Sequence, residues 1–140
     1  MKVFQPTASY EISLPDDVVE EHDGRVTSYW RTGHSLLLQF SSTSRILGEQ
    51  VTADDRLQDL YRRSPAEWSP CKISLQNFSG HCAAAQMRDK KGVAWIHAYL
   101  VTDRLAIHVT VSSPLTELET ADNWAIEAVR TLRVPPPVVN

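Results

Sequence analysis

The 140-residue sequence predicts an α+β domain, an antiparallel β-sheet of about six to seven strands with helices packed on its faces. The first supporting observation is strict alternation of apolar and polar residues over 105–112, the period of a half-buried strand. The second is that short turns join such segments directly, which favours antiparallel pairing. The third is a pair of amphipathic segments, 52–63 and 114–133, with helical spacing.

Size and composition predict a single domain over residues 1–134 and an extended proline-rich tail over 135–140. The net charge of −3 and the scarcity of basic clusters argue against nucleic acid or an anionic membrane as partner. The amino terminus lacks the apolar run of a signal peptide, and no window approaches a membrane span of about 20 apolar residues. We therefore expect a cytoplasmic protein, in which Cys71 and Cys82 are reduced thiols rather than a disulfide.

The amino-terminal third predicts a strand and a hairpin. Residues 10–14 alternate and stop at Pro15, which indicates a short strand near a sheet edge. The acidic stretch 16–24 is expected to be a solvated loop. Segments 26–30 and 35–40, rich in β-branched, aromatic and aliphatic residues, flank a four-residue turn with Gly33 and predict a hairpin.

Residues 52–63 carry the clearest helix pattern. Thr52 is placed to cap the amino terminus, and the acidic first turn and basic last turn complement the helix dipole. Ser64-Pro65 ends the helix. Residues 65–70 are expected to form a loop in which Trp68 covers the rim of the core.

The next segments predict four strands, 72–75, 81–88, 93–101 and 105–112, joined by short turns. Gly92 stands where a type I turn with a bulge needs a positive φ. The predicted register places Met87 opposite Trp95, Ala85 opposite His97, Ala83 opposite Tyr99, Leu100 opposite Ile107, Ala98 opposite Val109 and Ile96 opposite Val111. Ala84 and Ala98 then lie side by side on the opposite face, where small side chains let a helix approach closely.

That helix is expected to be the last element, opened by Pro114 and ended before the prolines at 135–137. Its apolar stripe repeats at spacings of three and four through Leu118, Ala121, Ala125, Ala128 and Leu132. Asp122 projects near this stripe. It is either a rim carboxylate that reaches water or an acid with a raised pKa in a pocket.

The predicted register gathers Met87, Trp95, His97, Tyr99 and His108 on one sheet face, as a candidate surface for binding a partner protein. The alternative is that another helix, 52–63, covers this face. His97 and His108 are diagonal neighbours there, but no carboxylate on the face completes a metal ligand set. We therefore expect neutral histidines and no metal.

Sequence motifs for chemistry are absent. The five glycines are isolated, so no phosphate-binding loop of the usual kind is present. The sequence contains neither a G-x-S-x-G elbow nor an H-E-x-x-H motif. We expect no catalytic residues and no cofactor.

Two stretches resemble a known family: 10–15, an alternating strand that ends in proline, and 125–133, a closing helix that leads into an extended segment. Together with the order of elements, they resemble the PsbP-like superfamily, which includes the photosystem extrinsic protein and the Ran-binding Mog protein. Asp16-Asp17-Val18-Val19 stands where that family usually has a tryptophan, so no functional residue is carried over. The resemblance implies a non-enzymatic binding or adaptor scaffold.

The sequence leads to the expectation of a small cytosolic protein-binding module without catalytic activity, such as an adaptor, a chaperone or an immunity-type inhibitor. The alternative is a small-ligand-binding protein or minor hydrolase with a pocket near His97, Tyr99 and His108. A structural subunit that self-associates through an edge strand is a third reading, and a homodimer remains open.

Overall fold

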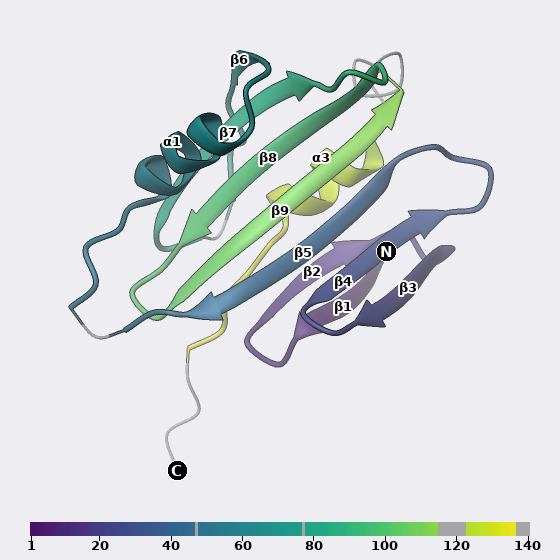
Figure 1. The fold of residues 1–140 in the computed structure, drawn as a ribbon. Coiled ribbons are helices and arrows are strands. Elements are labelled where there is room, and N and C mark those ends of the chain that lie inside the picture. Colours follow the sequence, from purple (N-terminus) through teal and green to yellow (C-terminus); the bar gives the residue numbers. More distant parts are fainter. Residues whose placement is uncertain (47, 77, 115–122, 137–140) are drawn as a thin grey trace.

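In the part of the chain that the structure describes, a seven-stranded antiparallel sheet and a two-stranded sheet pack with two helices (Figure 1). The structure, a computed structural model, describes residues 1–46, 48–76, 78–114 and 123–136. The large sheet has the order β3-β4-β5-β9-β8-β7-β6, and β1 pairs with β2, which confirms the predicted α+β class. The elements are β1 (Lys2–Thr7), β2 (Tyr10–Leu14), β3 (Val18–Asp23), β4 (Val26–Arg31), β5 (Leu37–Ser44), α1 (Ala53–Arg63), β6 (Glu67–Cys71), β7 (His81–Arg88), β8 (Val93–Val101), β9 (Leu105–Pro114) and α3 (Trp124–Arg130).

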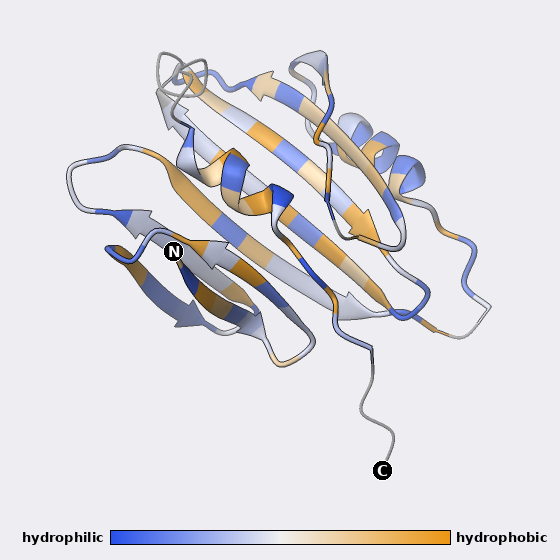
Figure 2. Ribbon diagram, turned by 180° about the vertical axis from the view of Figure 1, so that it is seen from behind, coloured by the Kyte–Doolittle hydropathy of each residue, from blue (hydrophilic) through white to orange (hydrophobic). Residues whose placement is uncertain are grey.

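The two faces of the large sheet are covered to different extents. Helix α1 packs on β7 and β8 on one side, which we call the α1 face (Figure 1). Helix α3 and the β1–β2 hairpin lie on the other side, the α3 face, and both stand in front of the sheet in Figure 2. On the α1 face, no described helix or strand packs over β4 and β5 (Figure 1).

The larger core lies on the α3 face. Here β9 contributes the alternating aliphatic residues that predicted it, and Ile107, Val109 and Val111 are almost completely buried. Each such side chain contributes about 1.5–3 kcal/mol by leaving water. Ala84 and Ala98 pair on this face, as predicted, within the core that α3 completes.

A smaller core joins α1 to the α1 face. Thr52 caps α1 through a capping box, in which its side chain accepts from the Asp55 amide at 3.0 Å and the Asp55 carboxylate accepts from the Thr52 amide. Leu57 and Leu60 then face Ala83 and Ala85 of β7, whose small side chains leave room for the helix. The predicted helix at 52–63 is therefore confirmed.

The predicted register of the central strands is also confirmed. Met87 lies opposite Trp95, and Tyr99 lies opposite Ala83 across β7 and β8. Between β8 and β9, all three predicted aliphatic pairs form. Gly92 has a φ of 82° in the tight turn before β8, the left-handed region that glycine reaches at little cost.

Three local predictions are wrong, and one strand was not predicted. Residues 16–24 contain the edge strand β3, whose residues from Val19 onward are exposed, so its polarity resembles that of a loop. Strand β6 occupies the predicted loop 65–70, and its Pro70 is tolerated at a sheet edge. Residues 72–75 form no strand. Strand β1 was missed because apolar residues alternate poorly in it.

The start of the last helix was also predicted incorrectly. Pro114 ends β9 instead of opening a helix, and the described helix α3 begins at Trp124, capped by the side chain of Asn123. Residues Leu118, Ala121 and Asp122 lie outside the described residues, so the question about the Asp122 carboxyl stays open. No helix in the described part of the chain is long and apolar enough to cross a membrane.

Candidate functional site on the α1 face

A row of apolar side chains crosses the large sheet on the α1 face. Antiparallel pairing aligns one residue from each strand, because side chains directly opposite one another share a face. The pairs Val19–Trp30, Trp30–Leu37, Leu37–Ser112, Ser112–Trp95, Trp95–Met87 and Met87–Trp68 are continuous across the sheet. We call Val19, Trp30, Leu37, Trp95, Met87 and Trp68 the apolar row. On β9, the position between Leu37 and Trp95 is occupied by the polar, buried Ser112.

Helix α1 covers only one end of this face. At that end, the Tyr61 ring of α1 lies 4.7 Å from the Trp68 ring, and the Trp68 indole donates to the Ser64 carbonyl. The remaining members of the apolar row are partly exposed, with Val19 at 39%. The apolar row is therefore accessible on β3, β4 and β5 and again on β8 and β7, whereas Ser112 of β9 between them is buried.

Trp95, on β8, is held in the apolar row by the preceding turn. Its indole N–H donates to the Asp89 carboxylate at 3.0 Å, and that carboxylate also accepts from the amides of Lys91 and Val93. These hydrogen bonds, led by that from Trp95, hold the pKa of Asp89 below its ordinary value. The indole is thus fixed in orientation, as a preorganised contact residue would be.

Next to the apolar row, His97 and His108 form a directly hydrogen-bonded pair. The distance from His97 Nδ1 to His108 Nε2 is 3.0 Å, and the two rings stack at 5.2 Å between centroids. The Tyr99 ring stacks on His108 at 4.4 Å, and Trp95 stacks on His97 at 5.9 Å. Four of the five predicted site residues therefore form one continuous aromatic stack.

Burial keeps both imidazoles neutral. Desolvation lowers the pKa of His97 to about 4. Desolvation, followed by the nearby His97 and the Arg63 guanidinium, lowers the pKa of His108 to about 4. Their hydrogen bond requires at least one neutral ring, because one nitrogen must accept the N–H of the other.

A cavity of about 240 Å³ opens beside Tyr99 and His108 on the α1 face. Arg25 reaches it from the β3–β4 turn, and Arg56 reaches it from α1. No carboxylate lines this cavity among the described residues. Its lining, which we call the Arg25–Arg56 groove, consists of Arg25, Ser41, Ser42, Thr43, Arg56, Tyr99, Ala106, Ile107 and His108.

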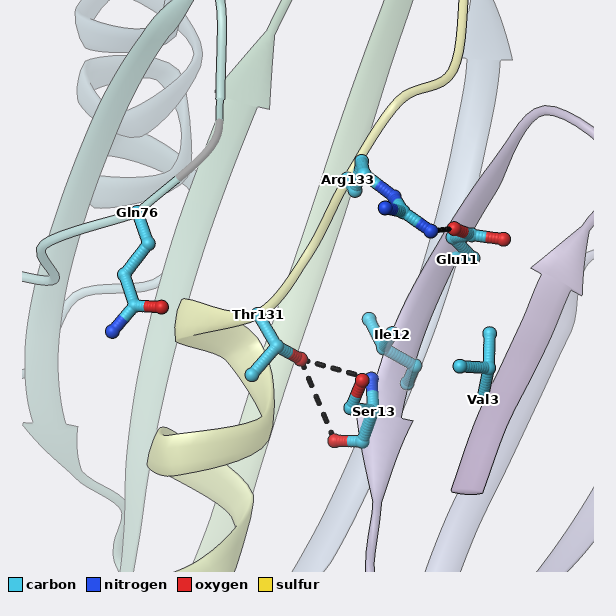
Figure 3. Close-up of a pocket in the computed structure, with 7 residues that line it drawn as sticks. All are labelled: Val3, Glu11, Ile12, Ser13, Gln76, Thr131 and Arg133. Carbon is cyan, nitrogen blue, oxygen red and sulfur yellow. Dashed lines mark hydrogen bonds and ion pairs between the residues drawn. The ribbon is translucent and has the colours of Figure 1, made fainter. Parts of the chain in front are cut away.

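A second cavity, of about 350 Å³, lies at the carboxyl end of α3 (Figure 3). Four of its polar residues pair with one another: Arg133 points to Glu11 and forms an ion pair, and Thr131 lies against Ser13 (Figure 3). The backbone amides and carbonyls of Glu11 and Arg133 also bond to each other at 2.9 Å in both directions. These contacts fasten the chain after α3 to β2, which gives this cavity a structural role.

All five predicted site residues lie on the α1 face. Met87, Trp95, His97 and His108 are partly exposed. Tyr99 is buried, with an exposed fraction of 9%, because α1 covers it. The helix that was expected to cover this face is thus present, but it covers only part of the face. The described residues contain no group of three or more histidine, cysteine or acidic side chains that could hold a metal, and Cys71 and Cys82 are free thiols.

Several residues of the site were missed from the sequence. Val19, Trp30 and Leu37 extend the apolar row across strands far from the predicted hairpin, and Arg25 and Arg56 enter from a turn and a helix. The composition of 26–30 predicted a strand that contains Trp30, but no local signal indicates the neighbouring strands. The missing information was the strand order.

No family model matches the sequence, and no curated protein matches it. Among solved structures, the chain is similar to a crystal structure from Bacteroides thetaiotaomicron VPI-5482, with a TM-score of 0.65 and 18% sequence identity. The match covers 96% of this chain and 48% of that chain, so this chain spans about half the length of that structure. At this identity the likeness shows a shared fold alone, and the resemblance to the PsbP-like superfamily stays a prediction.

Proposed function

We propose that this protein is a binding module that recognises another protein through the apolar row on the α1 face. The observation that carries the proposal is a line of partly exposed apolar side chains on β3, β4, β5, β8 and β7, interrupted on β9 by the buried Ser112. Tryptophan and methionine are enriched in protein interfaces, and the rigid tryptophan ring buries a large area at low entropic cost. Adaptor, chaperone and immunity-type inhibitor roles all use such a surface.

The dimensions of the apolar row favour a macromolecular partner. Six spacings of about 4.8 Å between neighbouring strands make the row about 29 Å long. A helix of about 19 residues has the same length at about 1.5 Å per residue. A polar rim with Ser28, Gln39 and Thr110 flanks the row on its His97 side, which resembles the apolar centre and polar edge of an interface.

The edges of the large sheet support a partner on the face over self-association by edge pairing. Strand β3 exposes Glu20, Glu21 and Asp23, and β6 carries Pro70. Charged side chains and proline at sheet edges oppose the addition of another strand. A homodimer, if it forms, would therefore use the apolar row.

Site-specific photo-crosslinking in the source cells tests the proposal. A photoreactive residue at Gln39, beside the apolar row, should crosslink to one defined protein, whereas one at the exposed Lys90 should not. The double variant Trp30→Ala, Trp95→Ala should lose this adduct while its circular dichroism remains that of a folded chain.

The matched control is Ile46→Ala, Val51→Ala, which removes apolar side chains that are 77% and 40% exposed away from the apolar row. It should keep the crosslink. An adduct with a second copy of the chain would identify a homodimer. An adduct that persists in the tryptophan variant, or the absence of any adduct at Gln39, would overturn the proposal.

A second candidate function is small-ligand binding, favoured by the Arg25–Arg56 groove beside Tyr99 and His108. The hydrolase form of this alternative gains no support. Within the described residues, His97 and His108 hydrogen-bond to each other and not to a serine or cysteine that could act as a nucleophile.

A further inference from the structure

The Arg25–Arg56 groove lies where two neighbouring strands differ in length. Strand β4 begins at Val26, opposite Ser41, whereas β5 continues through Ser42, Thr43 and Ser44. Those three residues pair with β9 on one side and have no β4 partner on the other (Figure 1). A strand without a neighbour offers unpaired backbone polar groups to a ligand.

We call the end of β5 that extends beyond β4 the overhang. Two cavities meet there. The cavity of about 240 Å³ and another of about 390 Å³ share Arg25, Ser42 and Thr43 in their linings. The second cavity adds hydroxyl-bearing and imidazole side chains near the β3–β4 turn, including Thr7 and His22. The overhang is thus open on both sides and rich in hydrogen-bond donors.

The two arginines have unused donors. Arg25 makes no ion pair or hydrogen bond to any described residue. Arg56 meets Glu49 only at 3.4 Å, and Glu49 bonds more closely to Arg45 at 2.8 Å. The Arg56 Nε atom is buried and has no hydrogen-bond partner among the described residues. A buried unpaired donor is costly, and a bound acceptor would remove that cost.

The neutral groups of the groove also suit an anion. The side-chain hydroxyls of Ser41, Thr43 and Tyr99 have no hydrogen-bond partners among the described residues. Their neighbour His108 leaves its Nδ1 atom unpartnered within the described residues, because its Nε2 pairs with His97. No carboxylate lines the cavity there, although the whole chain has a net charge of −3.

We infer that the Arg25–Arg56 groove binds a small organic phosphate monoester. Two guanidinium groups and three hydroxyls supply more donors than the two oxygens of a carboxylate accept, whereas a phosphate monoester presents three terminal oxygens. The Tyr99 ring and Ala106 offer apolar contact to the organic part. This inference deepens the second candidate function and is independent of the apolar row.

An NMR titration of the full chain with phenyl phosphate at pH about 7.5 tests the inference. Amide signals at 41–43 and 106–108 should shift and saturate. Benzoate, which has a similar ring but a carboxylate, should bind more weakly. Inorganic phosphate should shift the same signals, because it shares the anion.

Two substitutions locate the site. Arg25→Gln should weaken phenyl phosphate binding about tenfold or more, since a hydrogen bond to a charged group is lost. Arg25 is exposed and unpaired within the described residues, so this variant is expected to fold. Arg25→Lys should recover only part of the affinity, because lysine keeps the charge without the two-pronged geometry.

The matched control is Arg88→Gln, which removes the same charge from an exposed position on β7 beyond the apolar row. Its affinity should stay within about twofold of the wild type. The inference is overturned if no amide shift saturates below about 10 mM phenyl phosphate. It is also overturned if Arg25→Gln and Arg88→Gln bind alike, or if benzoate binds more tightly than phenyl phosphate. Trp30→Ala, which lies in the apolar row and outside the aromatic stack, should bind phenyl phosphate normally, which separates this test from that of the protein-binding proposal.

Discussion

Lowering the pH from about 7.5 to about 5 is expected to destabilise the fold through His97 and His108. Both imidazoles are largely buried, and their pKa values are about 4 in the folded chain. In an unfolded chain, a histidine has a pKa of about 6.5. As the pH falls, the unfolded state therefore binds protons before the folded state does. Lowering the pH shifts the folding equilibrium toward the unfolded state.

The sign and size of the change in stability follow from the folded and unfolded pKa values. Because the folded pKa is depressed, this stability is fully present above about pH 6.5 and is lost as the pH falls toward about 4. A difference of about 2.5 units corresponds to about 3 kcal/mol for each imidazole, of which about 2 kcal/mol is lost by pH 5. The two sites interact, since a second proton would place two N–H donors face to face. We expect the pair to cost about 2–4 kcal/mol at pH 5.

The assay is urea unfolding at the two pH values, followed by tryptophan fluorescence. The double variant His97→Gln, His108→Gln should show less than about 1 kcal/mol of pH-dependent loss, because its amides do not titrate. His34→Gln, which alters an exposed histidine in the β4–β5 turn, should behave like the wild type. Imidazole NMR signals of His97 and His108 that titrate near pH 6.5 would refute the reasoning.

Three further outcomes can be measured by thermal or chemical unfolding and one by thiol labelling. Leu38→Ala, at a fully buried core position, should cost about 2–5 kcal/mol in the free energy of unfolding; a loss below about 1 kcal/mol would contradict the described core. Thr52→Ala removes the cap of α1 and should cost about 1 kcal/mol; unchanged stability would argue against the capping box. Gly80→Ala should destabilise by about 1–3 kcal/mol, because a Cβ there would lie 2.3 Å from the Val101 carbonyl oxygen. Burial raises the pKa of the Cys82 thiol to about 11, so iodoacetamide should label Cys82 at pH about 7.5 only slowly until urea unfolds the chain; rapid labelling of the native protein would show that the thiol is accessible.

The sequence alone determined those parts of the fold whose information is local. Alternation along 105–112 identified β9, and the turns on either side of β8 set its register with both neighbours, because a slip of one residue would turn every aliphatic side chain to the wrong face. The amino-terminal cap and the terminal charges of 52–63 identified α1, because these signals also lie within the segment itself. The register predicted from the sequence also placed the five candidate residues on one face, where they lie in the structure.

Local patterns failed where a strand has only one neighbour. Strands β3 and β6 lie at the two edges of the large sheet, so most of their side chains face water and carry no strong alternation. Their composition, carboxylates in one and proline in the other, is what an edge strand needs to avoid further pairing. The same residues read in isolation indicate a loop.

Only the tertiary structure decided what the α1 face presents. Strand β5 pairs with β9 although α1, β6, β7 and β8 come between them in the chain. That pairing brings Trp30 and Leu37 into line with Trp95, and it places Arg25 and Arg56 around the end of β5. Periodicity fixes which side of its own strand a residue occupies, whereas the order of strands depends on the total burial that the folded sheet achieves. For that reason, the apolar row and the Arg25–Arg56 groove became visible only in the folded chain.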